Sequence, residues 1–139
     1  MADEEAMRMK ALIKLAQEEA ILNAKEIALE LTQDGYVFVE LYENKWQPMQ
    51  ESVFRKRKLK AGIELGLTVE SLEADLQKPQ DNDEESDLSL DKQEVIRIYF
   101  LSSGEMTPFI MKLKSEYMDK PYELVGKASG ELEIHRPDN

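Results

Sequence analysis

The hydrophobic period of the chain changes once, near residue 25, and this change limits the folds that the chain can adopt. Residues 3–24 contain no glycine or proline and are rich in alanine, leucine, glutamate and lysine, which favours a helix within 1–24. From residue 25 onward apolar and polar residues alternate, as expected of half-buried strands. One helix before seven or eight short strands predicts an α+β fold, an N-terminal α-helix followed by a β-sandwich of two mostly antiparallel sheets. We expect a single domain over 1–139, with the β-domain in 25–139.

The expected strands are bounded by turn residues. Asp34-Gly35 joins two alternating runs and is a strong hairpin signal. Gly130 lies near the turn of the last pair of runs, and Pro108 starts a strand, where a missing backbone N–H is tolerated. The runs expected to form strands are 27–31, 36–41, 54–59, 63–69, 96–101, 109–114, 122–129 and 130–136.

The helical run carries apolar residues on two nearly opposite faces when its residues are placed at about 100° per residue. A helix that lies on one domain needs only one such face. The second face is therefore either buried in its own domain or contacts partner helices. The wider stripe consists of Met9, Leu12, Ile13, Ala16 and Ala20. The narrower stripe, called the second stripe below, consists of Met7, Ala11, Leu15 and Leu22.

The net charge of −11 argues against a nucleic-acid-binding surface, because such surfaces need clustered Lys and Arg to neutralise phosphates. The basic run Arg55–Lys60 (RKRKLK) is the one place where such contacts must be considered. Three interpretations of this run are open. It is a phosphate-contacting patch, a charged strand that prevents edge-to-edge pairing, or a partner for an acidic segment of the same chain. We expect no nucleic-acid partner for so acidic a chain.

The acidic segment 71–93 has eight Asp and Glu against two Lys, which is −6 of the net charge. High charge and low hydrophobicity predict a mobile loop. Three acidic residues that begin at Asp81 match positions one, three and five of an EF-hand frame. Ser86 replaces the turn glycine and Lys92 replaces the bidentate glutamate, so the EF-hand interpretation fails. Weaker cation binding by this loop stays open.

The residues that would support catalysis are scarce in this sequence. There is no cysteine, so disulfides and thiolate metal sites are excluded. His135 is the only histidine, and one histidine cannot build a His-based metal site or a Ser-His-Asp triad. No glycine-rich phosphate-binding motif occurs. We therefore expect no catalytic residues, no cofactor and no metal, and a binding or assembly module is the predicted class.

The stretch FLSSGEMTPFIMKL resembles the C-terminal signature of the GspH/FimT family of minor pseudopilins and pilins, in which a Gly-Glu/Arg-x-Thr-Pro-Phe turn joins two strands. Upstream, MRMKALIKLAQEEAILNAKEIALEL is similar to the family's helix and first strand. DGYVFVELYENKWQPM resembles its second strand with a Trp-Gln-Pro ending, and LKAGIELGLTVE the next strand. The resemblance covers nearly the whole chain except the acidic segment.

The resemblance implies that these motifs hold the fold and have no catalytic role. Gly104 would permit a turn with positive φ, Pro108 would start a strand with its φ restricted, and Phe109 would point into the core. The residues for which a structural role is implied are Trp46, Pro48, Gly104, Glu105, Thr107, Pro108 and Phe109.

The resemblance also implies a function and partners. It implies a minor pseudopilin of the type II secretion system, at or near the tip of the pseudopilus, which supports protein export across the outer membrane. The partners would be the other minor pseudopilins (I, J and K), the major pseudopilin and secreted substrate proteins. The second stripe of the helix would face those subunits. The alternatives are a type IV pilus minor pilin of the DNA-uptake type, and a stand-alone soluble domain whose acidic loop binds cations.

Family members are anchored in the inner membrane of Gram-negative bacteria by an N-terminal hydrophobic segment, and their globular domain lies in the periplasm. Neither that segment nor the family's Gly-Phe cleavage site is present in this sequence. The sequence is therefore expected to be the soluble periplasmic domain, beginning partway along the helix.

Overall fold

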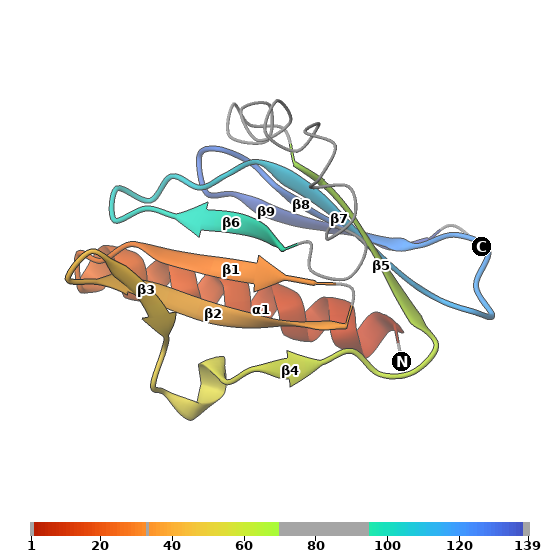
Figure 1. The fold of residues 1–139 in the computed structure, drawn as a ribbon. Helices are drawn as coiled ribbons and strands as arrows, with labels where there is room; N and C mark the ends of the chain where they lie inside the picture. The colour runs from red at the N-terminus through yellow and green to blue at the C-terminus, as the bar shows by residue number, and fades with distance from the viewer. Residues whose placement is uncertain (1, 33, 70–94, 138–139) are drawn as a thin grey trace, which may run out of the picture.

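The computed structural model describes residues 2–32, 34–69 and 95–137, and it contains one helix and two antiparallel sheets (Figure 1). Helix α1 spans Ala2–Leu22. The first sheet contains β1 (Ile27–Leu31), β2 (Gly35–Tyr42), β3 (Lys45–Pro48), β4 (Arg57–Lys58) and β6 (Ile96–Phe100). The second contains β5 (Ile63–Val69), β7 (Phe109–Ser115), β8 (Tyr122–Gly126) and β9 (Leu132–His135). The expected α+β fold, with a helix before two antiparallel sheets, is confirmed.

The strand order is β3-β2-β1-β6 in the first sheet, with β4 paired to the other half of the β2 edge, and β5-β7-β8-β9 in the second. The Asp34-Gly35 hairpin forms as predicted, since β1 pairs with β2 from Leu31↔Tyr36 to Ile27↔Glu40. Its turn is held by the backbone N–H of Thr32, which donates to the carbonyl of Gly35 at 2.9 Å.

The helix ends at Leu22, two residues before the predicted limit, and the backbone explains where it stops. Ala24 adopts a left-handed conformation with φ 52°. The N–H of Lys25 then donates to the carbonyl of Ala20 at 3.1 Å, which is the bond that closes a Schellman cap. Lys25 also places its ammonium 2.8 Å from a carboxylate oxygen of Glu40 on β2, so that the helix end is tied to the first sheet.

The predicted strand over 54–59 is mostly wrong. A single 3-10 turn covers Ser52–Phe54, and only Arg57–Lys58 forms a strand. The reason is that Phe54 turns into the core, where its ring lies 5.2 Å from that of Phe38. A chain that buries Phe54 in this way leaves the edge of the sheet for several residues and returns to it only at β4.

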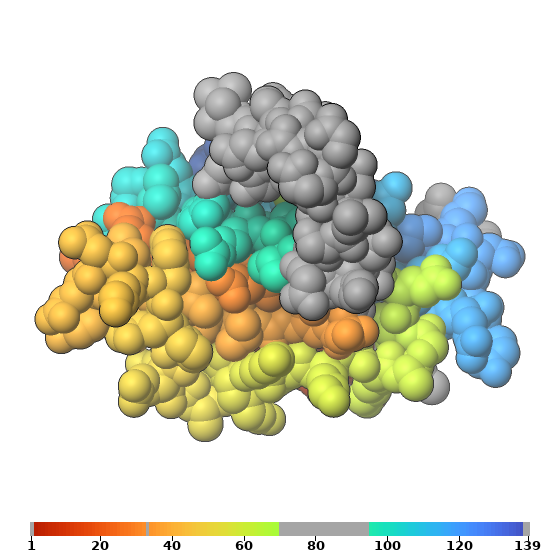
Figure 2. Space-filling model, viewed as in Figure 1, coloured from red at the N-terminus to blue at the C-terminus, as the bar shows by residue number. Residues whose placement is uncertain are grey.

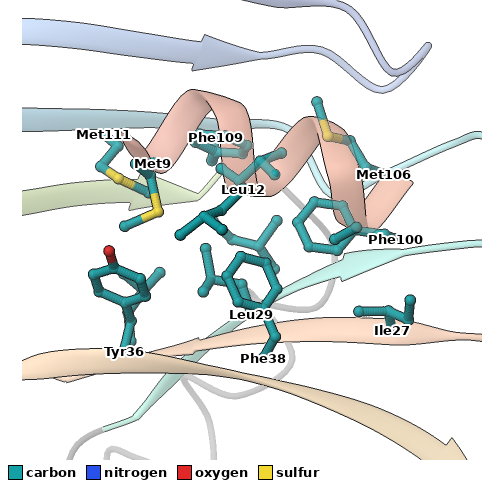
Figure 3. Packing of buried hydrophobic residues seen from close by; sticks show 14 of the residues in the cluster. Met9, Leu12, Ile27, Leu29, Tyr36, Phe38, Phe100, Met106, Phe109 and Met111 are labelled. Carbon is teal, nitrogen blue, oxygen red and sulfur yellow. The ribbon is translucent and has the colours of Figure 1, made fainter. Parts of the chain in front are cut away.

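The hydrophobic core lies between α1 and the inner faces of both sheets (Figure 3). The wider helix stripe is buried there in full, as predicted from its period. The alternation in β1 and β2 is also confirmed, because Leu29 and Phe38 face this core while their neighbours Glu30 and Val37 do not belong to it. Both sheets and the helix therefore share one core.

We expect Phe38→Ala to lower the free energy of unfolding by about 3–5 kcal/mol, because a fully buried aromatic ring is removed from close packing. Val37→Ala, on the other face of the same strand, should cost about 1 kcal/mol. Urea denaturation followed by circular dichroism measures both values. Equal losses for the two variants would contradict the assignment of the strand faces.

Candidate functional site

The second stripe of α1 is exposed along its whole length. Leu22 is 79% exposed, Met7 45% and Leu15 43%, and Ala11 is also exposed. Among the described residues, nothing covers this face of the helix. The alternative in which the second stripe is buried in its own domain is therefore wrong for the described part of the chain, while contact with partner helices stays a prediction.

The Gly-Glu-x-Thr-Pro-Phe stretch forms the connection between β6 and β7. Gly104 has φ +100°, and its N–H donates to the carbonyl of Leu101 at 2.9 Å, which gives a tight turn that only glycine adopts easily. Thr107 is buried and its hydroxyl oxygen accepts from the N–H of Tyr99 at 3.1 Å. Pro108 directly precedes β7, and the ring of Phe109 is buried in the core.

Glu105 is exposed in this connection, and its carboxylate accepts a hydrogen bond from the hydroxyl of Ser103 at 3.4 Å. Its backbone carbonyl accepts from the N–H of Leu101 at 2.8 Å. The backbone of Glu105, more than its side chain, therefore closes the turn.

A second glycine turn meets the first one beside the helix. Gln17 of α1 donates from Nε2 to the carbonyl of Gly130 at 2.7 Å. Gly130 has φ +101°, and a Cβ there would lie 2.6 Å from the carbonyl oxygen of Gly104. A Cβ on Gly126 would lie 2.2 Å from the ring of Phe109. The β6–β7 and β8–β9 turns thus close on each other and on Gln17.

Sequence reasoning missed Gln17 and Gly126 and treated Gly130 only as a turn residue. A polar residue beside the wider stripe is ordinary in a helix, so its sequence neighbours carry no signal of a distant carbonyl. Two glycines four residues apart at 126 and 130 were the available hint of a close approach.

Trp46 belongs to a cluster on the outer face of the first sheet. Its ring centroid lies 5.7 Å from that of Tyr99, and the guanidinium carbon of Arg97 lies 5.7 Å from the Trp46 ring. Arg97 also forms an ion pair with Glu30 at 2.6 Å. Pro48 lies on the same face at the end of β3 and is exposed.

The rings of this outer cluster span the sheet from one edge strand to the other. The pairings Ala28↔Val39 and Ala28↔Tyr99 place the small Ala28 on the outer face between them. Ala28 and Val39 are both buried although neither belongs to the main core. Burial lowers the pKa of Arg97, but the interactions with Glu30 and Tyr99 together outweigh this, and the net shift of the pKa is upward. Sequence reasoning found Trp46 but not Arg97, Tyr99 or Glu30.

The remaining candidates are charged. The side chains of the basic run are exposed except for Leu59 and Arg57, which are half-buried. The acidic segment 71–93, and with it the residues weighed for an EF-hand, lies outside the described residues. His135 is exposed, with Nε2 3.3 Å from a carboxylate oxygen of Glu133.

In the described ranges, no group of three His, Cys, Asp or Glu side chains is placed to hold a metal ion. The one helix in that part of the chain is not apolar enough to span a membrane.

Comparison with known proteins gives two kinds of match. The family model described as type II transport protein GspH matches residues 5–130. Two solved structures of the minor pseudopilin EpsH from the Type 2 Secretion System of Vibrio cholerae are similar to this chain, each over 99% of it. The match extends over 98% of the chain of the first structure, with a TM-score of 0.74, and over 95% of the chain of the second, with a TM-score of 0.73. The sequence identity is 22% in both cases. At this identity the structures establish the fold. No curated protein sequence matches significantly.

We expect Gly130→Ala to lower the free energy of unfolding by about 1–3 kcal/mol or more, because the position has positive φ and the new Cβ meets the Gly104 carbonyl. Gly66→Ala is the matched control, since its Cβ would meet only Lys112 Cβ at an ordinary 3.9 Å. That control should be neutral or gain up to about 1 kcal/mol. Thermal unfolding measures the stability of both variants. A Gly130→Ala variant as stable as the original chain would show that the two turns are not in close contact.

Proposed function

The chain belongs to the GspH family of type II transport proteins, and on that premise we propose that it is a minor pseudopilin at or near the tip of a pseudopilus, where it supports protein export. The family model spans residues 5–130, so the family extends over the helix and both sheets. The resemblance identified from the sequence motifs is thereby confirmed. In this proposal the chain acts by assembly and without catalysis.

The observation that carries this proposal is the exposed second stripe of a helix whose opposite face is locked into the core. Met7, Ala11 and Leu15 follow one another at intervals of four residues, and Leu22 continues the stripe seven residues, or about two turns, later. Such spacing lets ridges of one helix enter the grooves of another. Because the wider stripe holds α1 rigidly, little conformational entropy is lost when a second helix packs on it.

Removal of these side chains from water would favour association by about 25 cal/mol for each Å² of apolar surface. The partners that fit are the helices of other pseudopilins, that is the minor pseudopilins I, J and K and the major pseudopilin. In this proposal the β-domain faces outward and offers its surface to further subunits or to secreted proteins.

The proposal includes an orientation relative to the membrane. A hydrophobic segment N-terminal to α1 would hold the protein in the inner membrane before assembly, with the β-domain in the periplasm. The N-terminal end of α1 is then the end of the domain nearest the bilayer. Assembly would move the subunit away from this position while keeping the helix direction.

A second candidate function has one observation in its favour. The exposed basic run resembles the surface that a DNA-uptake minor pilin of the type IV pilus would need. The net charge of −11 opposes it. A stand-alone cation-binding domain depends on the acidic segment, which lies outside the described residues.

We expect Leu15→Glu to weaken binding to the periplasmic domains of the other minor pseudopilins of the same system by at least about tenfold, or about 1.4 kcal/mol. The reason is that a buried apolar contact would be replaced by a desolvated carboxylate. Calorimetry with the partner domains, singly and as a preformed complex, measures the affinity.

Val53→Glu is the matched control, because Val53 is similarly exposed but lies on the 3-10 turn away from the helix. It should leave the affinity unchanged. Binding that survives Leu15→Glu would remove the second stripe from the interface. Tight DNA binding without any pseudopilin binding would favour the uptake pilin instead.

A further inference from the structure

The basic run is a concentration of positive charge in which only Lys60 pairs with a described carboxylate. Residues 55–60 carry five positive charges in six positions of a chain whose net charge is −11. No ion pair joins Arg55, Lys56, Arg57 or Lys58 to a carboxylate of the described residues. Burial and the nearby Arg55 guanidinium both lower the pKa of Arg57. Positive charge of this density, with so few ion pairs to the described carboxylates, favours an anionic partner.

The two arginine side chains of this run are held by nearby backbone carbonyls. Arg55 donates from Nη1 to the carbonyl of Ser52 at 2.9 Å, and Arg57 donates to that of Val53 at 2.8 Å. Among the described strands β4 pairs only with β2, so its other edge has no strand partner in that part of the chain. Figure 2 shows this segment, in yellow, along an open edge of the molecule. The two guanidinium groups are therefore held in place before any partner arrives, and the lysines of the run are exposed.

The run ends beside the first turn of α1. The ammonium of Lys60 lies 3.6 Å from a carboxylate oxygen of Glu4. In Figure 1 the N-terminus and the β4–β5 connection lie at the same end of the molecule. The basic run thus leads to the end from which any segment N-terminal to α1 would continue.

A second segment at this end carries an exposed aromatic ring. The backbone N–H of Glu116 donates to the carbonyl of Gly62 at 3.1 Å, so the β7–β8 connection starts next to the β4–β5 connection. Tyr117 in that connection is 89% exposed, the most exposed of the large apolar side chains in the described residues. Lys120 is exposed nearby, and the opposing charges are the exposed carboxylates of Glu116 and Asp119.

We propose that this end of the domain contacts the headgroup surface of a bilayer that contains anionic lipids, with the basic run on the phosphates and Tyr117 at headgroup depth. Lys, Arg and Tyr are the residues that anchor proteins at membrane interfaces. The inference rests on the proposed orientation, in which an anchor precedes α1. Since the whole chain is strongly acidic, the contact forms only when that anchor holds this end against the bilayer. It sets the tilt of the domain before assembly.

The test uses the absence of native cysteine, which makes single-site labelling direct. The chain carries an N-terminal histidine tag and is tethered to vesicles by a nickel-chelating lipid, which replaces the anchor. A fluorophore is placed at Ala61→Cys in the β4–β5 connection or at Ser129→Cys in the β8–β9 turn, both exposed. A headgroup-attached quencher reports proximity on neutral phosphatidylcholine vesicles and on vesicles that also contain phosphatidylglycerol.

We expect quenching at Ala61→Cys to rise about twofold or more when phosphatidylglycerol is present, and to return to the neutral value in about 0.5 M salt, where charges are screened within a few ångströms. Quenching at Ser129→Cys should not change. Lys56→Glu/Lys58→Glu should abolish the increase. Lys14→Glu/Lys127→Glu, an equal charge change away from the basic run, should preserve it. Tyr117→Ser should reduce quenching on both kinds of vesicle.

Quenching that is equal on the two kinds of vesicle, or that persists in Lys56→Glu/Lys58→Glu, would overturn the proposal. So would a loss of binding to pseudopilin domains by that variant in the absence of lipid, because the run would then be a protein interface. The tether makes this outcome independent of the proposed function. Lipid contact without pseudopilin binding would refute the assembly role alone, and pseudopilin binding without lipid contact would refute only this inference.

Discussion

The burial of one face of α1 against both sheets is the interaction on which the rest of the structure depends. Met9 and Ile13 are fully buried, and the helix contacts β1 and β6 of the first sheet as well as β7, β8 and β9 of the second. The apolar side chains of both inner faces form one cluster with this helix face. Without the helix, the side chains that it covers would be exposed to water at a cost of about 25 cal/mol for each Å².

This dependence explains why the glycine turns lie where they do. The β6–β7 and β8–β9 turns approach the helix near Gln17, and the space between them admits no Cβ at Gly130. Glycine is therefore required there by close approach as well as by positive φ. The same helix leaves its second stripe exposed to water. One apolar face of α1 therefore packs in the core, and the other forms an apolar surface.

The outer surface of the first sheet carries a cluster of aromatic rings, and one of its edges carries basic side chains. On the first sheet, Trp46, Tyr99 and Arg97 cover a strip that would otherwise be exposed, and the Arg97–Glu30 ion pair holds the guanidinium beside the ring. At the edge of that sheet, the β4 segment is basic and open. A sheet edge with free backbone groups is commonly protected by charge. Here the charge also lies beside the N-terminus of the helix, and in the proposed orientation that position brings it to the lipid headgroups.

The element types, the buried helix stripe, the Asp34-Gly35 hairpin and the family could all be predicted from the sequence, because each depends on residues close together in the chain or on a motif read in order. It failed at 54–59, where burial of Phe54 against Phe38 overrides a local strand pattern. The exposure of the second stripe, the meeting of Gln17 with Gly130 and the Trp46–Arg97 contact were decided only by the tertiary structure. Each joins or separates residues far apart in sequence, and local periodicity carries no information about which distant groups the packing of the core brings together.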